Sequence, residues 1–447
     1  MKKIRLSTTH IIMLSFLSAI LFGSVLLALP ISSASGEAVP YIDALFTATT
    51  ATCVTGLVTV PTVSTWSLFG QIVILLLIQV GGLGIITVMA SFVVFMNRKL
   101  GLGDRLLLQD AFNLNSLAGL SAFVRKVLLG TLFVEGIGAL LYLPVFVKDF
   151  GIKGIWISVF NSISAFCNAG IDIIAEDSLC GYGTHFWVNF VTSALIVIAG
   201  IGYIVWWDIL RVLKAPNLRR WKHLTLHTKI ALSTTSILIF GGALVIFLLE
   251  FRNPQTIGNM PLFDQIQVSL FQSITTRTAG FAGIPQQNLS EGAAMACCLL
   301  MFIGGSPVGT AGGVKTVTIA VLFACAFSMI KNKNETVLFD RRISREMVGK
   351  AVAVVTMALM IAISSTLLLS ATIDAPAVDI MYETISATAT VGLTRGITPL
   401  LNIWGKLIII ATMYLGRIGP ISLAFAFSVR SKSENLIKNP IEPISVG

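Results

Sequence analysis

The chain has 447 residues, of which 55% are hydrophobic and only 12% are charged, and its formal net charge is +10. Soluble domains carry about 25% charged residues, so this composition, with a mean hydropathy of +0.87, excludes an ordinary soluble protein. Apolar stretches such as 68–96 and 186–206 exceed the roughly 20 residues that cross a bilayer as a helix. The sequence therefore predicts an all-α, polytopic membrane protein.

The first apolar run, residues 11–31, follows a basic start and lies where a signal peptide would lie. A signal peptide has an apolar core of only about 7–15 residues. This run has full spanning length, so we expect it to be retained as the first spanning helix.

Most of the 31 lysines and arginines gather in five clusters, at 2–5, 98–126, 211–229, 331–350 and 430–438. The apolar segments between the clusters hold most of the acidic residues. Because Lys and Arg mark cytoplasmic loops, the positive charge indicates topology and not binding to nucleic acid. Both termini are therefore expected in the cytoplasm, with lipid headgroups near the basic loops.

The five clusters enclose four blocks, and each block must cross the membrane an even number of times. Each block has two spanning segments on either side of a shorter stretch, which must enter the membrane and return. The spanning pairs are 10–31 and 66–96, 121–147 and 184–213, 226–250 and 290–331, and 346–371 and 402–430. We predict four tandem helix–pore-loop–helix repeats around one pore, with eight spanning helices and four re-entrant loops. The repeats cover 1–97, 98–214, 215–333 and 334–447, and the last includes a cytoplasmic C-terminal tail.

The four shorter stretches read LFTATTATCVTGL, VFNSISAFCNAGI, LFQSITTRTAGF and MYETISATATVGL, and their glycines recur about every 110 residues. Non-helical backbone survives at membrane depth only where it is buried or lines a water-filled path. Its carbonyl oxygens can then replace the hydration shell of a cation. Helix-packing glycines are the alternative, but packing does not explain the period. The predicted K⁺-binding filter comprises Val54, Thr55, Gly56, Asn168, Ala169, Gly170, Thr278, Ala279, Gly280, Thr390, Val391 and Gly392.

These four stretches, together with GGSPVGTAGGVKT at 304–316, resemble the Trk/Ktr/HKT superfamily of potassium transporters, most closely its Ktr-type membrane subunit. The resemblance covers essentially the whole chain and implies a K⁺ pathway in a homodimer in the bacterial plasma membrane. It also implies a cytoplasmic ring of nucleotide-binding regulatory subunits. The chain itself has no Walker or GxGxxG motif, so we expect no cofactor in it, and ATP or ADP on the partner. In the family, four filter glycines accompany K⁺ preference, but the unequal VTG, NAG, TAG and TVG sequences leave the K⁺/Na⁺ ratio open.

Residues 304–313 interrupt an apolar run that is too long for one ordinary crossing. A third crossing in this block would place the 331–350 cluster outside, so we expect a break within one helix, just below the filter. The resemblance implies an intramembrane gating loop, and a passive proline–glycine kink is the alternative. The predicted gate comprises Gly304, Gly305, Ser306, Pro307, Gly309, Thr310, Gly312, Gly313, Lys315 and Arg417.

Single charges within apolar segments are expensive and need a partner or a cavity. We expect Arg417 to approach the 304–313 loop, where it repels cations, caps loop carbonyls, or does both. Lys315 is expected to snorkel to the interface, with a second cation barrier as the alternative. Arg277, beside the third filter, is expected to anchor its pore helix to an acid such as Asp264 or Glu291, and repulsion of K⁺ from a position facing the pore is the alternative.

Acidic residues give weaker signals. Asp172, Glu176 and Asp177 follow the second filter and either concentrate cations at the entrance or form a solvated loop. Glu135 is interpreted as a buried structural acid.

Three functions are compatible with a polytopic membrane protein. A gated K⁺ uptake pore fits the four glycine stretches, whereas a symporter coupled to H⁺ or Na⁺ should carry more acids within its spanning segments. An intramembrane protease is disfavoured, because we find no intramembrane HExxH, no GxGD and no convincing Ser–His pair. The six cysteines show no metal-binding spacing. We therefore predict a transport protein and not an enzyme.

Overall fold

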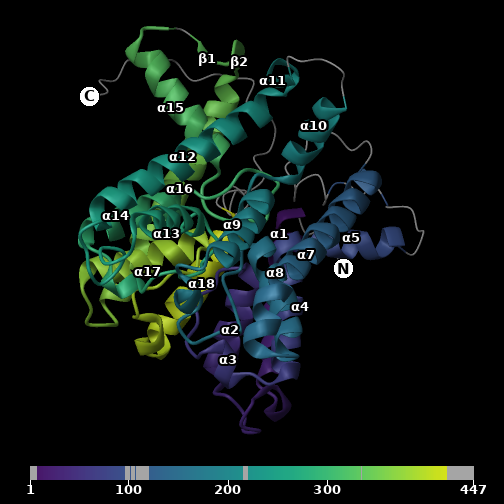
Figure 1. Cartoon of the computed structure of the whole chain (residues 1–447). Coiled ribbons are helices and arrows are strands. Elements are labelled where there is room, and N and C mark those ends of the chain that lie inside the picture. The colour runs from purple at the N-terminus through teal and green to yellow at the C-terminus, as the bar shows by residue number, and fades with distance from the viewer. Residues whose placement is uncertain are drawn as a thin grey trace.

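The computed structural model describes residues 8–95, 101, 106, 120–214, 220–333 and 335–419, and it is predominantly helical (Figure 1). The basic clusters at 2–5 and 430–438, most of 98–119 and Arg219 lie outside the described residues. The predictions for the two termini and for the C-terminal tail concern residues outside the described ranges.

Among the described residues, four single helices are long and apolar enough to cross a bilayer, as the sequence predicts for the first helix of each repeat. They are α1 (Thr8–Leu27), α7 (Leu120–Phe150), α12 (Leu226–Glu250) and α16 (Arg345–Ser370). Each packs against the short helix that follows it, namely α2 (Tyr41–Cys53), α8 (Lys153–Cys167), α13 (Leu262–Thr275) and α17 (Ala377–Ala389). We call these four short helices the pore helices.

Three pore helices begin with the same local signal. A proline precedes α2, α13 and α17, and an aspartate lies in the first turn of each (Asp43, Asp264 and Asp379). Proline fixes a backbone angle compatible with a helix start, and an acid there complements the helix dipole. The opposite, partly negative ends of these helices lead into the glycine stretches.

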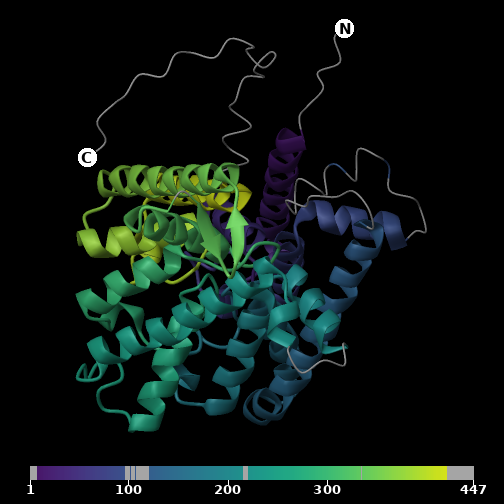
Figure 2. The same ribbon diagram turned by 90° about the horizontal axis from the view of Figure 1, so that it is seen from above.

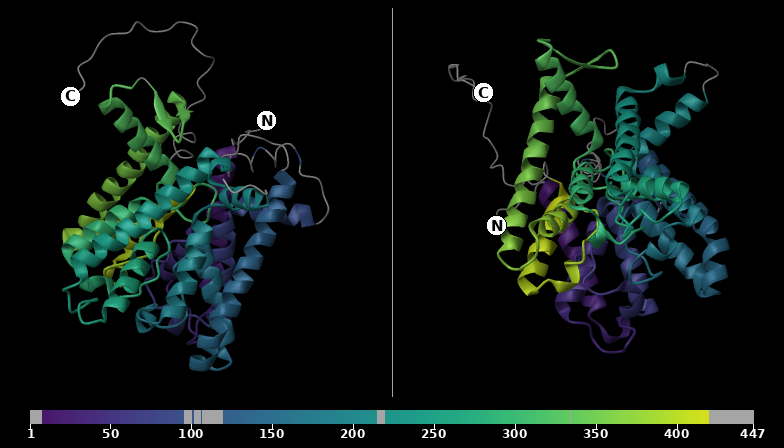
Figure 3. Two further views of the ribbon diagram at one scale, coloured as in Figure 1. Left: turned by 45° about the horizontal axis from the view of Figure 1, so that its top comes forward. Right: turned by 60° about the vertical axis from the view of Figure 1, so that its left-hand side comes forward.

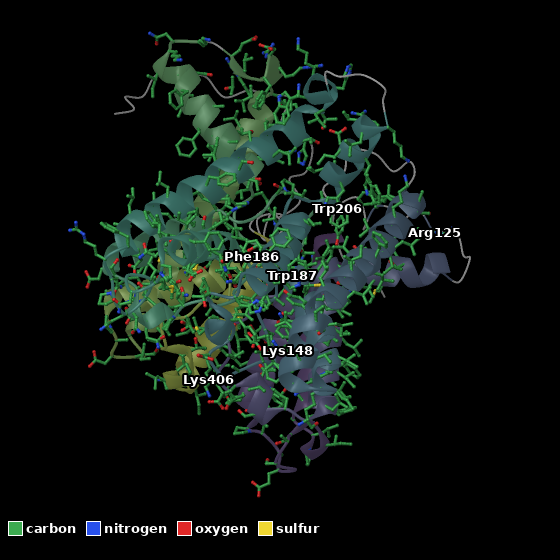
Figure 4. The ribbon with its side chains drawn as sticks, viewed as in Figure 1. Arg125, Lys148, Phe186, Trp187, Trp206 and Lys406 are labelled. Atoms are coloured by element: carbon green, nitrogen blue, oxygen red, sulfur yellow. The ribbon has the colours of Figure 1, made fainter. Side chains whose placement is uncertain are left out.

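The second helices of repeats one and two were predicted as continuous segments, and this is wrong. Repeat one divides at Gly84 into α4 (Leu68–Leu83) and α5 (Ile85–Phe95). Repeat two divides into α9 (Phe186–Gly200) and α10 (Tyr203–Leu213), which bend by 94° at Gly202. The Trp206 indole, which Figure 4 labels, donates to the Ile198 carbonyl beside the break at 2.7 Å.

The last described helix, α18 (Ile403–Ile418), ends at Gly419, and the remainder of the predicted 402–430 segment lies outside the described residues. Gly84, Gly202 and Gly419 have φ values of +83°, +90° and +89°, a left-handed region that side chains disfavour. The sequence signal is a glycine two or three residues after another, in GLG, GIG and GRIG. We overlooked this signal because the surrounding hydropathy is continuous.

In repeat three the predicted break is present. Helix α14 ends at Phe302 and α15 (Thr316–Ile330) begins after the loop, while α14 itself starts at Glu291. The loop returns on itself, because the Gly304 amide donates to the Val314 carbonyl at 3.0 Å and the Val314 amide donates to Phe302 at 3.1 Å. The segment is therefore an ordered loop with defined ends.

The second helix of each repeat packs against the pore helix of the next. Thus α4 contacts α8, α9 contacts α13, α14 contacts α17, and α18 contacts α2. The last of these contacts brings the C-terminal repeat back to the first, so the series of contacts closes, and Figure 2 shows the yellow C-terminal helices near the purple N-terminal helix. Helices of repeats that are distant in sequence are thereby fixed around one centre.

A short antiparallel hairpin departs from the predicted all-α class. Strands β1 (Thr336–Leu338) and β2 (Arg341–Ile343) pair with Leu338 opposite Arg341. The hairpin and α11 (Arg220–His223) lie at one end of the molecule, and α3 (Thr62–Thr65) lies at the other (Figures 1 and 3). This placement is expected for two basic clusters on one side of a membrane. Four 3₁₀ turns lie in the loops, at Pro30–Ser32, Cys180–Tyr182, Gln286–Asn288 and Thr398–Leu400.

Candidate ion pathway

The four glycine stretches leave their pore helices in the same way. Val54, Asn168 and Thr390 cap α2, α8 and α17 in the left-handed conformation, with φ values of +55°, +59° and +52°. Thr278 takes the equivalent conformation, with φ +69°, after α13 has ended. Two residues further on, Gly56, Gly170, Gly280 and Gly392 again have positive φ. The repeated conformation therefore supports the interpretation of the four stretches as equivalent units.

The same glycines bring the four stretches together. A Cβ on Gly56 would lie 2.5 Å from the Ala169 carbonyl oxygen, and one on Gly170 would lie 2.5 Å from that of Ala279. A Cβ on Gly280 would meet the Val391 carbonyl, and one on Gly392 would meet that of Thr55. Each glycine thus faces the carbonyl that precedes the next repeat's glycine, and the sequence of contacts closes. We call this arrangement the glycine ring.

Hydroxyl groups on the pore helices form hydrogen bonds with the backbone of the glycine stretches, and we call these bonds the hydroxyl brace. The Gly56 amide donates to Thr50 Oγ1 at 2.9 Å, and the Gly392 amide donates to Ser386 Oγ at 3.0 Å. In repeat two, Ser164 Oγ accepts from the Ile171 amide at 3.1 Å, and in repeat three Thr275 Oγ1 donates to the Phe281 carbonyl at 2.7 Å. This brace was not predicted. Its signal is a Ser or Thr six residues before the glycine, or five in the third repeat.

Several polar atoms around the ring are buried without a hydrogen-bond partner among the described residues. They include Thr55 Oγ1, Thr390 Oγ1 and both polar atoms of the Asn168 amide. Buried polar groups normally find a partner. These oxygens, with the ring carbonyls, are the hard ligands that a K⁺ ion prefers, so the donor set fits a dehydrated cation as cargo.

The loop between α14 and α15 lies directly against the ring. The Gly312 amide donates to Thr278 Oγ1 at 3.0 Å, and Thr310 Oγ1 donates to the Phe166 carbonyl at the same distance. A Cβ on Gly312 would lie 2.6 Å from the Ala389 carbonyl oxygen. The loop therefore contacts the ends of three pore helices, where the sequence placed it.

Arg417 reaches this loop, as its position in the last helix predicts. Its guanidinium donates to the Thr310 carbonyl at 2.9 Å and to the Gly81 carbonyl at 2.5 Å. Gly81 belongs to α4, so Arg417 connects the loop of repeat three to repeats one and four. Arg417 thus caps a loop carbonyl, which was one of its two predicted roles. Its position is also compatible with the other role, repulsion of cations.

Two further cations are held by the same loop, contrary to our predictions. Lys315 does not snorkel outward, because its ammonium donates to the Ala311 carbonyl at 2.5 Å. Arg277 is not anchored by Asp264 or Glu291, since its guanidinium donates to the Gly304 carbonyl at 3.2 Å. Sequence alone could not reveal these partners, because the loop carbonyls become acceptors only once the helix opens. Three positive side chains therefore surround one loop.

The acidic residues near the second filter prove different from one another. Asp172 is buried and accepts from the Ser178 hydroxyl at 2.5 Å and from the Ile174 amide at 3.3 Å. Burial raises the pKa of Asp172 to about 6. Asp172 therefore shapes the loop instead of presenting a surface charge, whereas Glu176 and Asp177 are exposed.

Glu135 lies within α7 and is buried. Its carboxylate accepts from the Gln79 amide of α4 at 3.1 Å, and its backbone carbonyl accepts from Ser162 of α8 at 2.7 Å. These contacts agree with a structural acid that joins repeats one and two.

A helical membrane fold whose inward loops converge on a ring of backbone carbonyls is an architecture suited to passing cations. The chain belongs to the TrkH family of cation transport proteins, whose sequence profile matches residues 4–439.

Individual relatives agree with this assignment over nearly their whole length. The chain is 38% identical to the potassium/sodium uptake protein NtpJ of Enterococcus hirae, covering 99% of this chain and 98% of that protein. It is 39% identical to the Ktr system potassium uptake protein B of Bacillus subtilis, covering 97% and 95%. Among solved structures, the potassium transporter TrkH from Vibrio parahaemolyticus matches with a TM-score of 0.74 at 16% identity, covering 96% of this chain and 86% of that one. The last comparison shows that the fold is shared.

Proposed function

We propose that this chain is the ion-translocating pore subunit of a K⁺ uptake system, with the glycine ring as its selectivity filter. The closed sequence of glycine–carbonyl contacts carries this proposal, because a ring of carbonyls can replace the hydration shell of K⁺. By name, one relative is a potassium/sodium uptake protein and the other a potassium uptake protein. The four repeats, 1–97, 98–214, 215–333 and 334–447, would then each supply one quarter of the filter.

The loop at 304–313 is proposed to act as the gate below this filter. It lies on the cytoplasmic side in the predicted topology, contacts three pore helices and is surrounded by Arg277, Lys315 and Arg417. Positive charge next to the pathway opposes cation passage. Movement of the loop away from the axis would remove both the steric and the electrostatic obstacle.

Regulation is proposed to come from outside this chain. Two relatives are parts of a "Ktr system" by name, which is compatible with a plasma-membrane homodimer that docks on a cytoplasmic ring of ATP- or ADP-binding subunits. The basic loop around Arg219 and Arg220 is a candidate docking surface. Charge reversal of both residues should weaken co-purification of that ring, and unchanged co-purification would remove this loop from the interface.

Flux into liposomes that contain the purified protein tests the function. We expect K⁺ uptake that exceeds Na⁺ uptake and that proceeds without an imposed proton or sodium gradient. Strict dependence on either gradient would favour the alternative, a K⁺ symporter coupled to H⁺ or Na⁺. Absence of K⁺ flux, with and without gradients, in folded protein that also lacks part of the 304–313 loop would contradict both.

A further inference from the structure

In each of the four glycine stretches the second residue is aromatic, and the residue that follows it is polar. These residues are Thr47, Asn161, Gln272 and Glu383, and all four are buried. Glu383 alone among them is an acid, and its relative exposure is 0%. A buried carboxylate is expensive unless its oxygens are hydrogen-bonded, so its partners indicate what it does.

Both carboxylate oxygens of Glu383 bind the chain that leaves the fourth filter. Thr394 Oγ1 donates to Oε2 at 2.6 Å, and the Thr398 hydroxyl donates to Oε1. Thr394 lies two residues after Gly392, and Thr398 begins the 3₁₀ turn that follows. Glu383 therefore joins pore helix α17 at two points to the segment that follows its own filter, residues 394–398, which we call the outgoing limb.

A second contact fixes the same limb. Arg395 Nε pairs with Asp379 Oδ1 at 2.5 Å, one turn before Glu383 on α17. The Arg395 guanidinium also donates to the Leu289 carbonyl of repeat three at 3.0 Å. The outgoing limb is thus tied to its pore helix and to the neighbouring repeat.

In repeat three the equivalent position makes the same kind of connection with neutral groups. The Gln272 amide donates to Gln286 Oε1 at 2.7 Å, and Gln286 lies in the chain that follows the third filter. The Tyr382 hydroxyl, from the residue before Glu383, donates to the same Gln286 oxygen at 3.0 Å. Two successive repeats therefore use this pore-helix position to hold the segment beyond the glycine.

We propose that Glu383 is a positioning residue for ion discrimination, because it holds Thr394 and Thr398 and so fixes the outgoing limb of the fourth filter. This inference rests on the proposed function. The Val391 carbonyl faces Gly280 and the Thr55 carbonyl faces Gly392, so movement of this limb would disturb two contacts of the glycine ring. Selectivity depends on the number and geometry of the carbonyl ligands, and a freed limb therefore lowers it.

The test is the K⁺/Na⁺ flux ratio in liposomes for Glu383→Ala, Glu383→Gln and the double variant Thr394→Val/Thr398→Val. Glu383→Ala should lower the ratio about tenfold, because hydrogen bonds to charged groups are among the stronger ones. The double valine variant should lower it by a similar factor. Combining it with Glu383→Ala should add little, since both changes remove the same contacts. Glu383→Gln should retain most of the ratio, because an amide of the same shape accepts from one hydroxyl and donates to the other.

Thr366→Val is the matched control. Its hydroxyl contacts the same pore helix through Thr384 at 2.6 Å but does not touch the outgoing limb. We expect a wild-type ratio in this variant. K⁺-dependent thermal stabilisation in detergent, relative to Na⁺, gives a second readout that does not require flux and tests whether folded variants still bind K⁺.

A wild-type ratio in folded Glu383→Ala and in the double valine variant would overturn the inference and leave the proposed function standing. A wild-type protein that conducts Na⁺ as well as K⁺ would contradict the proposed K⁺ selectivity itself. A ratio that falls as far in Glu383→Gln as in Glu383→Ala would overturn positioning, because only the charge would then matter.

Discussion

The glycine ring and the loop beneath it are both non-helical, yet they are held in different ways. Each glycine stretch of the ring is hydrogen-bonded to a hydroxyl of its own pore helix, and a Cβ at the ring glycines would meet the backbone of the next repeat. The loop is held by three long cationic side chains at its backbone carbonyls and by hydrogen bonds such as those of Gly312 and Thr310, but Pro307–Gly309 at its centre are only partly buried. A segment with few packed side chains orders less firmly. This difference underlies the proposed roles of the ring as a fixed filter and of the loop as a movable gate.

The largest effect should follow from filling the ring. Gly56→Ser places a side chain against the Ala169 carbonyl at a residue with φ +95°, so we expect the K⁺/Na⁺ flux ratio to fall at least about tenfold. Gly36→Ser is the control, because Gly36 also has a positive φ of +76° but nothing lies within 4 Å of its Cβ position. An unaltered ratio in folded Gly56→Ser would show that Gly56 does not line the pathway.

The next effect should come from releasing the loop. Arg417→Ala removes hydrogen bonds to Thr310 and Gly81, and charged hydrogen bonds contribute about 1.5–3 kcal/mol each. We expect K⁺ flux without any cytoplasmic partner to rise about tenfold, and deletion of part of the 304–313 loop should act in the same direction. Lys406→Ala is the control on the same helix, since Lys406 pairs with Asp43 at 2.5 Å and lies toward the α3 end of the molecule (Figure 4).

Flux that stays constant or falls in both loop variants, with the protein folded, would identify the loop as a passive kink. The difference between the two regions would then have no functional meaning.

A smaller effect should come from one brace of the ring. Thr50→Val removes the acceptor of the Gly56 amide, and a neutral hydrogen bond contributes about 1 kcal/mol, so the K⁺/Na⁺ ratio should fall about threefold to fivefold. Thr49→Val is matched to it, because the buried Thr49 hydroxyl donates to Leu45 within its own helix. Equal ratios in the two variants would mean that the hydroxyl brace does not set the ring geometry.

The smallest effect concerns the pH dependence of stability. The pKa of Asp172 is raised to about 6 by burial, whereas in an unfolded chain it would be about 3.9. The unfolded state therefore releases this proton first, and wild-type stability should fall as pH rises from about 4 to about 6. Asp172→Asn should lose this dependence, which melting temperatures at pH 4 and pH 7 would show. An equal change in melting temperature between pH 4 and pH 7 in the two proteins would argue against this assignment.

Two kinds of feature could be predicted from the sequence, those that recur with a fixed period and those whose local composition is unusual. Four glycines at one period identified the stretches that now meet in the ring, and the glycine-rich 304–313 segment identified the loop. The breaks at Gly84 and Gly202 were missed, because apolar residues on both sides hide a change of direction that only φ reveals. The partners of Arg277 and Lys315 were missed for another reason. Their acceptors are backbone carbonyls that a continuous helix would have occupied.

The most direct test of the central claim is to locate the ion in crystals of the protein soaked in Rb⁺ or Tl⁺, by anomalous diffraction. The account predicts anomalous density on the axis between the carbonyls of Thr55, Ala169, Ala279 and Val391, which the glycine contacts bring together. Density only at sites outside this ring, in crystals whose soak solution contains ample Rb⁺ or Tl⁺, would contradict it.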